Sequence, residues 1–424
     1  MLASQARDGG SIPLTRSLMK TAKPAYFKFA FLSSSSGKFG GALYVSINTL
    51  LVALGASAFQ VGLVNLLQTI GETFSQFVGL WYINLFSSRR KSEILSMIII
   101  GLPVLLLAIV AFIQMKYWFV VISGIAFFSG LSGKASYLCW YSWMGSIVPQ
   151  KLRNYFFGTR SFFGQIGQVT GFIIAFFVLK LNFPILILLG FLYFFSYVFN
   201  MIETGTYFLH PDSGRQIIVK NHIIHRMSKV LKDRDFLNFL CWFTLLSGAL
   251  IANILYLEFF MINVLKLAYS WIPISFVLLA LSSAASFYSL RNYFSIISYS
   301  KKRLIISILV LLSCIFWLFA NSVLFFALSL FLAGFSSGAL TLSEKVDLIN
   351  HSTINDKEAN YAVFNFAYPL FSSVLILFLS MFQIFKFNFH ITFYITIALT
   401  FFSLVFIKKF PRATLSQPKP SIFS

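Results

Sequence analysis

The feature that most constrains this chain is a series of apolar runs, each long enough to cross a membrane as a helix. A helix needs about 20 apolar residues to span the hydrocarbon core of a bilayer. Twelve such runs lie at residues 30–53, 59–84, 94–114, 118–145, 155–178, 184–207, 237–261, 271–290, 304–320, 323–344, 360–383 and 390–407. The ninth and tenth adjoin, and Ala320-Asn321-Ser322 supplies polar residues for a reversal between them. The sequence therefore predicts an all-α membrane protein with twelve transmembrane helices.

The composition excludes a soluble globular protein. Hydrophobic residues make up 58% of the 424 residues and charged residues 11%, and the mean hydropathy is +0.82. Soluble domains carry about 25% charged residues, because they need polar groups to cover their surface. The formal net charge of +21 would suggest nucleic-acid binding in a soluble protein. Here the basic residues fall mostly between the apolar runs, so we expect the lipid bilayer as a partner and no nucleic acid.

The basic residues also predict an orientation, since cytoplasmic loops are enriched in Lys and Arg. They gather in both terminal segments and in every second loop, whereas the alternate loops hold only Lys116, Lys180, Lys266 and Lys386. Both terminal tails, residues 1–29 and 408–424, are therefore expected in the cytoplasm. We expect a monomeric, multi-pass protein of the cell inner membrane.

A polar interruption at residues 208–236 divides the apolar runs into two sets of six. Within it, residues 216–232 form a basic amphipathic pattern, which predicts a helix lying flat on the inner leaflet. The two sets repeat one another weakly at a nearly constant offset. The matching segments are Arg89-Arg90-Lys91 with Lys301-Lys302-Arg303, Asn154-Tyr155 with Asn360-Tyr361, and the small-residue runs 129–133 and 334–338. Such a pattern favours a duplication, with an N-terminal lobe at 30–207, a cytoplasmic linker at 208–236 and a C-terminal lobe at 237–407.

The loops next to the second and fourth runs carry a resemblance to a known family. Trp140-Tyr141-Ser142-Trp143-Met144 is followed by Pro149, Arg153, Gly158 and Arg160, and Gly79 precedes Arg89-Arg90-Lys91. This pattern resembles the major facilitator superfamily (MFS), and in particular uncharacterised bacterial members with a W-x-x-W…P…R…G-x-R junction. In the region where the family's loop carries an aspartate, this chain has Ile83-Asn84. The resemblance implies two pseudo-symmetric six-helix lobes, alternating access between them, and gating by Arg89, Arg90, Lys91, Arg153 and Arg160.

Three ionisable residues lie deep within the predicted spans: Lys38, Glu72 and Lys134. A charge at the centre of a spanning helix costs about 2.5–3.5 kcal/mol on insertion scales, so it normally faces a partner or a wet cavity. One interpretation is a Lys–Glu pair that fastens two helices. The other is a cavity whose excess positive charge attracts an anionic or carboxylate-bearing solute, with Glu72 as a proton-coupling carboxylate.

Polar stripes on the predicted helices mark further candidate substrate-binding residues. Residues three or four positions apart share a helical face, and such stripes occur in the second and eleventh runs. With Lys38 and Lys134, the predicted substrate-binding residues are Asn48, Asn65, Gln68, Gln168, Asn365 and Tyr368. The alternative for each amide is an interhelical hydrogen bond, which is a common use of polar residues in membranes.

Residues near the ends of the predicted spans have simpler expected roles. Glu203, Glu258 and Glu344 are expected to reach water, and Arg160 to extend to the inner face. Trp140 and Trp143 are expected to anchor at the membrane interface. In the fifth run, Gly164, Gly167 and Gly171 share one side, which predicts close approach of another helix.

We therefore expect a secondary active transporter that moves a small organic solute, coupled to protons or another ion. The alternative is a non-transporting membrane sensor or assembly partner that retains the fold. The chain is not expected to be an enzyme or to bind a cofactor or metal, because it has no Walker loop, H-E-x-x-H or G-x-S-x-G motif. A Ser–Lys dyad of Lys134 with Ser132 or Ser136 is a third, weaker alternative, since all three residues would share one helix.

Overall fold

The computed structural model describes residues 24–83, 86, 88–148, 153–210, 227–228, 230–255, 257–319, 322–351, 357–384 and 390–407. These residues form helices and connecting turns, with no strand among them. The first half contains α2 (Pro24–Leu43), α3 (Ile47–Ala53), α4 (Ala58–Ile83), α5 (Arg89–Ile113), α6 (Trp118–Ile147), α7 (Arg153–Leu179), α8 (Ile185–Thr206) and the 3-10 turn η2 (Tyr207–Leu209). The second half contains α10 (Arg234–Leu255), α11 (Leu257–Phe259), the π-helical turn η3 (Phe260–Val264), α12 (Trp271–Ile296), α13 (Tyr299–Leu318), α14 (Val323–His351), α15 (Lys357–Ile384) and α16 (His390–Val405).

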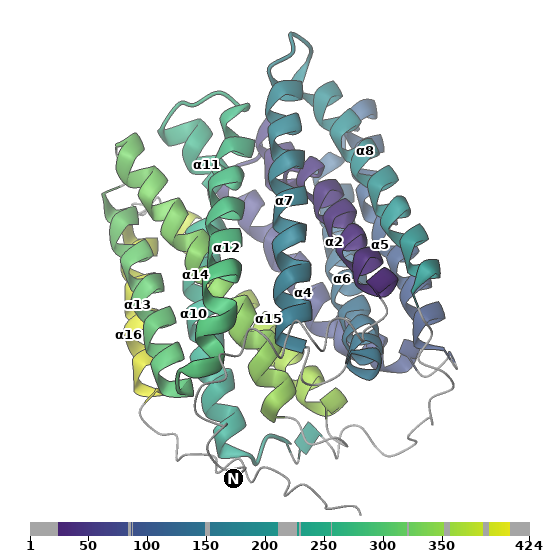
Figure 1. The fold of residues 1–424 in the computed structure, drawn as a ribbon. Helices are drawn as coiled ribbons and strands as arrows, with labels where there is room; N and C mark the ends of the chain where they lie inside the picture. The colour runs from purple at the N-terminus through teal and green to yellow at the C-terminus, as the bar shows by residue number, and fades with distance from the viewer. Residues whose placement is uncertain are drawn as a thin grey trace, which may run out of the picture.

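The predicted spans are confirmed as helices. Each of the twelve apolar runs coincides with one helix or with a helix that breaks near its end. Within the part of the chain that the structure describes, eight helices meet the length and hydropathy of a membrane span. The helices run up and down between two faces (Figure 1). We call the face at which α2 begins and α16 ends the proximal face, and the opposite one the distal face.

Two of the spans are irregular near the distal face. The first pauses between Leu43 and Ile47, where Val45 has a φ of 51°. A β-branched residue seldom adopts this left-handed conformation, so the chain cannot continue as a regular helix there. In the seventh, the π-helical turn η3 widens the helix before the chain reverses. Such π-helical turns are rare and frequently lie at functional sites.

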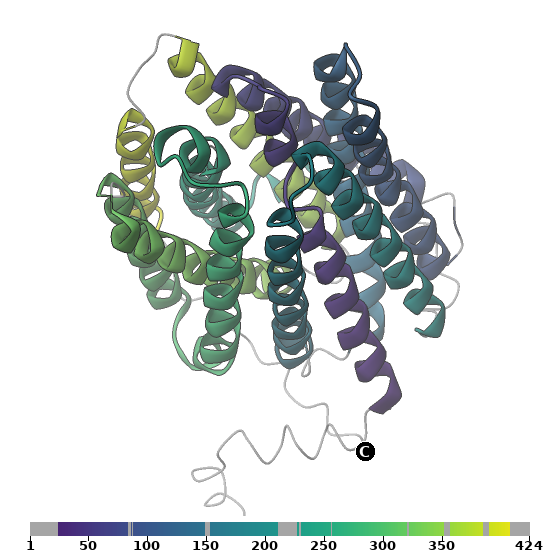
Figure 2. The ribbon, with the colours of Figure 1, turned by 90° about the horizontal axis from the view of Figure 1, so that it is seen from above.

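The two halves pack their helices in the same way. In the first half the contacting pairs are α4–α6, α2–α7, α2–α8, α5–α6 and α5–α8. Their counterparts in the second half also pack together, as α12–α14, α10–α15, α10–α16, α13–α14 and α13–α16. Seen from above, the purple and blue helices of the first half lie beside the green and yellow helices of the second (Figure 2). The protein therefore has two pseudo-symmetric lobes of six spanning helices each.

The matched small-residue runs lie at equivalent helix contacts. On α6, Gly130 lies against the backbone carbonyl of Gln68 on α4. On α14, Gly334 lies against the backbone carbonyl of Leu279 on α12. A side chain larger than hydrogen would collide with these carbonyls, and small residues at such points let helix backbones approach closely. The predicted close approach at Gly164, Gly167 and Gly171 is also confirmed, because all three lie against α2.

The lobes meet mainly along two pairs of helices, α4 with α15 and α7 with α12. Phe172 and Phe276 stack between α7 and α12, with ring centroids 5.2 Å apart. Between α4 and α15, Ser373 donates a hydrogen bond of 3.0 Å to Thr69. These contacts place α15 of the second lobe against α4, the helix that carries Glu72.

Candidate functional site

The structure brings Glu72 of α4 and Lys134 of α6 together. The ammonium Nζ of Lys134 lies 3.9 Å from Oε2 of Glu72, and both side chains remain about one fifth exposed, at 24% and 20%. The close packing of α4 on α6 sets this geometry, because Gly71 and Gly130 each lie against a backbone carbonyl of the other helix. Glu72 directly follows Gly71, and Lys134 stands one turn after Gly130. The charge pair therefore sits where the two helices are pressed together.

The same ammonium reaches the second lobe. Nζ of Lys134 lies 5.5 Å from the ring centroid of Tyr368 on α15, and 5.3 Å from that of Tyr137. A cation over an aromatic face is attracted by the electrons of the ring. The ring of Tyr368 in turn packs edge-on against Phe243 of α10, at 5.8 Å. Lys134 thus contacts a carboxylate of its own lobe and an aromatic ring of the other.

Other predicted substrate-binding residues lie on α4 and α15 beside this pair or on the separate helices α2 and α7. Gln68 is half-buried one turn before Glu72, and Asn365 is buried about one turn before Tyr368. On α7, Gln168 is half-buried. Lys38 is exposed on α2 and makes no ion pair with any residue in the described ranges; its side chain passes Gly164 of α7. The structure therefore joins Lys134, and not Lys38, to Glu72.

Asn48 and Asn65 form a separate cluster toward the distal face. Asn65 Nδ2 donates a hydrogen bond of 2.7 Å to Asn48 Oδ1. Asn48 Nδ2 approaches the backbone carbonyl of Leu255 on α10, at 3.5 Å. This is the interhelical role that polar side chains commonly take in membranes. The contact of Asn48 with Leu255 also crosses from the first lobe to the second.

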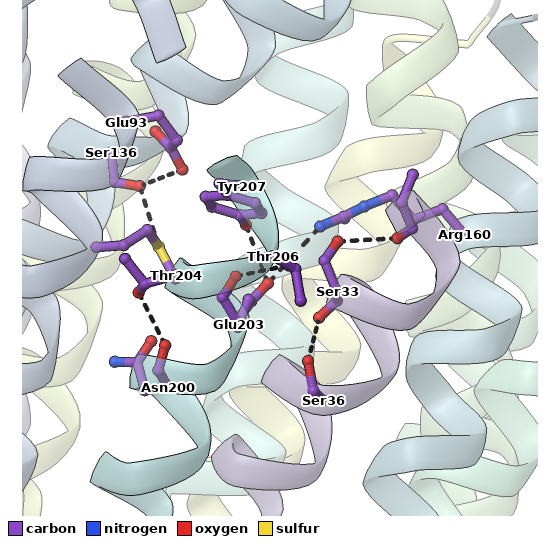
Figure 3. Close-up of polar contacts among 12 residues, drawn as sticks. Ser33, Ser36, Glu93, Ser136, Arg160, Asn200, Glu203, Thr204, Thr206 and Tyr207 are labelled. Atoms are coloured by element: carbon purple, nitrogen blue, oxygen red, sulfur yellow. Dashed lines mark hydrogen bonds and ion pairs between the residues drawn. The ribbon is translucent and has the colours of Figure 1, made fainter. Parts of the chain in front are cut away.

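The predicted gating residues make contacts within the first lobe. Arg160 Nη2 lies 3.9 Å from Oε1 of Glu203, and its guanidinium stacks at 4.4 Å over the ring of Trp140. Tyr207 donates a hydrogen bond of 3.0 Å to the same Glu203 oxygen (Figure 3). Arg90 donates to the carbonyl of His210, at 3.0 Å.

The remaining gating candidates differ in their surroundings. Arg89 is buried and Lys91 is exposed. The side chain of Arg153 lies outside the described part of the chain. The contacts of Arg90 and Arg160 join α5 and α7 to the α8–η2 end, so they hold the proximal end of one lobe together.

Four expectations about span ends were wrong. Glu203 and Glu258 do not reach water, since they are 9% and 2% exposed. Arg160 does not extend to the inner face, because Glu203 and Trp140 hold it inside the lobe. Trp140 and Trp143 do not anchor at an interface but pack in a buried cluster with Phe156 and Tyr207. For Glu203, Arg160 and the two tryptophans the common cause is η2, which continues α8 and places Tyr207 over these groups, whereas α3 of the other lobe packs against the helix that carries Glu258.

The sequence analysis missed two buried carboxylates, Glu93 and Asp347. Glu93 of α5 is 1% exposed and accepts a hydrogen bond of 3.1 Å from Ser136 of α6 (Figure 3). It directly precedes the predicted start of the third span and follows three basic residues, so it resembled a loop charge. The neighbouring serines at 92 and 96, one helical turn apart, were the available signal for a polar helix contact.

No metal-binding constellation is formed by the residues that can be described. In those ranges, no three His, Cys, Asp or Glu side chains gather as a cation would require. The chemistry available at the Glu72–Lys134 pair is instead proton binding and electrostatic attraction.

Comparison with known proteins identifies the fold. The family model for the Major Facilitator Superfamily matches residues 29–343. No curated protein matches the sequence. Among solved structures, the nucleoside transporter NupG superimposes with a TM-score of 0.68 at 13% identity, over 91% of this chain and 100% of that chain.

Two further solved structures share the fold. The human organic anion transporter MFSD10 has a TM-score of 0.64 at 12% identity, over 91% of this chain and 100% of its own. The E. coli fucose:proton symporter FucP has a TM-score of 0.65 at 11% identity, over 90% and 98%. At these identities the likeness concerns the fold, and the substrates named differ from one structure to the next.

Proposed function

The chain belongs to the Major Facilitator Superfamily, and from this premise we propose that it is a secondary active transporter for a small organic anion. It carries the solute across the membrane by alternating access of its two lobes, with Glu72 as the proton-coupling carboxylate. The observation that carries this proposal is the Glu72–Lys134 pair, which sits deep in α4 and α6 and reaches Tyr368 of the other lobe.

The pair links proton binding to anion binding. When Glu72 is ionised, it neutralises Lys134, and an anionic solute finds little net positive charge there. When Glu72 takes up a proton, the charge of Lys134 is uncompensated and can attract a carboxylate, because Coulomb attraction is strong in a site with little water. Proton and anion therefore bind best together, which is the thermodynamic requirement for coupled transport.

Lys38 supplies a second positive charge on the same lobe. Since it makes no ion pair with a described residue, its exposed ammonium adds to the attraction for an anion. Four further polar side chains are proposed to hydrogen-bond the solute; they are Gln68, Gln168, Asn365 and Tyr368. Asn48 and Asn65 are proposed to act at the distal contact between the lobes instead. Organic anion transport and proton symport on this fold, as named for MFSD10 and FucP, are in keeping with the proposal.

We assign a mechanical role to the basic residues at the proximal face. Arg90 and Arg160 fasten α5 and α7 to the α8–η2 end, so they keep the first lobe rigid while it rocks against the second. Arg89, Lys91 and Arg153 are proposed to act at the same face as gating residues. The proposed setting is the cell inner membrane, with the proximal face and both termini in the cytoplasm and the protein as a monomer.

A ligand screen is the first test. The purified protein is heated with a panel of organic carboxylates and, for each, the neutral amide of the same skeleton. Ligand binding raises the melting temperature by mass action. Carboxylates should raise it and their amides should not, and the shift should be lost in Lys134→Met but kept in the distal-loop control Lys116→Met. Equal shifts by carboxylates and amides would contradict an anionic substrate.

Transport of the carboxylate that gives the largest shift is the second test. In proteoliposomes with an imposed proton gradient, the native protein should accumulate it uphill. Glu72→Gln should abolish accumulation but retain counterflow exchange, since exchange needs binding and rocking without net proton movement. Binding without counterflow in the native protein would favour the sensor or assembly partner. Uphill accumulation by Glu72→Gln would remove Glu72 from the coupling step.

A further inference from the structure

The two irregular spans meet at the distal contact between the lobes. Helix α3, which follows the break at Val45, packs against α11, which leads into the π-helical turn η3. Irregular helices in transporters expose backbone groups and side chains to bound ions. Here the two irregular segments lie on opposite sides of one interface. Any group held between them changes its surroundings when the lobes separate at the distal face.

Glu258 of α11 is that group. Its side chain is 2% exposed, and the side chains of Ser46 and Asn48 from the first lobe lie within hydrogen-bonding reach of its carboxylate. Its oxygen Oε2 has no hydrogen-bond partner among the residues described. The carboxylate is therefore enclosed by the other lobe and only partly satisfied.

The groups that face Glu258 carry no compensating positive charge. From the first lobe these are Ser46 and Asn48, and Tyr193 of α8, whose hydroxyl donates a hydrogen bond of 2.9 Å to the Ser46 carbonyl. Tyr44 packs on Tyr193, with ring centroids 5.4 Å apart. From its own lobe the nearby backbone is that of α10, whose Leu255 carbonyl faces Asn48. Over the described ranges, Glu258 forms no ion pair with Lys or Arg.

A buried carboxylate in such surroundings is stable only when it carries a proton. An ionised carboxylate removed from water without a counter-charge costs far more than a neutral polar group, and in practice the group becomes neutral. Ionisation becomes favourable once α3 and α11 separate and water reaches the side chain. Closure of the distal contact and protonation of Glu258 are thus linked by the same desolvation.

We propose that Glu258 is a second proton-binding site, occupied while the distal contact is closed and vacated when it opens. The proton comes from the solution on the distal side and returns to it. Low pH on that side therefore favours the closed contact, and high pH favours the open one. This inference needs only the separation of the lobes at the distal face, and it holds whether or not Glu72 couples transport.

The test measures the distance between the lobes at the distal face. Spin labels are attached to cysteines introduced at Lys116 and Lys266, which are exposed in distal loops of different lobes. The native cysteines at 139, 241 and 314 are replaced by serine. Pulsed dipolar spectroscopy then gives the distance distribution of the full chain in detergent between about pH 5 and about pH 9, a range that spans the titration of ordinary and shifted carboxyl groups.

With Glu258 present, the short-distance population should dominate at low pH and give way to a longer one as the pH rises. Glu258→Gln should stay at the short distance throughout, because the amide cannot ionise. The matched control Glu93→Gln removes a buried carboxylate that lies within the first lobe, so it should retain the pH dependence. If Glu258→Gln does not fold, Glu258→Met offers a neutral side chain of similar volume.

Three results would overturn the inference. The first is an unchanged pH dependence in Glu258→Gln, and the second is a native protein whose distances do not respond to pH. The third is a distance change that follows replacement of Na⁺ by choline but not pH, which would identify a metal cation in place of the proton. Failure of the Glu72 transport experiment would leave this measurement and its interpretation intact.

Discussion

The ammonium of Lys134 lies 3.9 Å from the carboxylate of Glu72 on the neighbouring helix, within a contact that Gly71 and Gly130 hold closed. Two roles were open for these residues, a structural pair and a binding site. The geometry combines the two roles, since the ammonium of Lys134 also lies over Tyr368 of the other lobe. A pair that spans both lobes changes its surroundings as they move. Its contribution to stability and its contribution to transport can be measured separately.

A double-mutant cycle measures the structural contribution. Glu72→Gln leaves Lys134 without its counter-charge, so we expect a loss of roughly 1–3 kcal/mol in the free energy of unfolding, between the values for exposed and buried pairs. Lys134→Met in the Glu72→Gln background should recover most of that loss. Denaturation of the purified protein in detergent gives the four values. A double mutant as unstable as the sum of the single changes would show that the two side chains do not interact.

Glycine substitutions on α6 test the helix contact that positions the pair. An alanine at Gly130 would press on the Gln68 carbonyl, whereas at Gly133 it would meet open space. Both changes favour the helix by up to about 1 kcal/mol, so the comparison isolates the collision. Gly130→Ala should destabilise by about 1–3 kcal/mol, as overpacking usually does, and Gly133→Ala should be neutral or stabilising. Equal melting temperatures for the two variants would contradict the close approach of α4 and α6.

Cysteine labelling tests the orientation in the membrane. Lys116 and Lys266 are exposed at the distal face, and Lys232 and Lys301 at the proximal face. A membrane-impermeant thiol reagent added to intact cells should label Lys116→Cys and Lys266→Cys. It should reach Lys232→Cys and Lys301→Cys only after the membrane is opened. Labelling of all four from outside would contradict the two-faced arrangement of the helices.

The sequence predicted the spans well because each depends on local composition. Runs of about 20 apolar residues need no partner to be recognised. The partners of the buried charges depend instead on which helices adjoin. Lys38 and Lys134 were equally good partners for Glu72 by depth, and only the packing of α4 on α6, with α2 on α7, separates them. Glu258 looked like a span end because an apolar run does not show that α3 of the other lobe packs against it.

His210, which lies just beyond α8, allows a prediction about pH and stability. Its Nδ1 lies 3.0 Å from the Thr206 carbonyl, and its ring packs 5.7 Å from that of Trp143. Burial lowers the pKa of His210 below its usual 6.5. As the pH falls, His210 of the unfolded chain therefore binds a proton near pH 6.5, whereas His210 of the folded protein is still neutral. Since stability rises with pH wherever the unfolded state binds more protons, the protein should lose stability as the pH drops below about 6.5.

The variant His210→Gln isolates this effect. Glutamine has no group that titrates in this range, so the fall in melting temperature between about pH 7 and about pH 5 should be shallower than in the native protein. The absolute stability of the variant can differ, because the contact with Trp143 changes, and only the slope is compared. Parallel slopes for the two proteins would assign the acid sensitivity to other groups. A shallower slope would show that the proximal end of the first lobe excludes a proton from this histidine when it is folded.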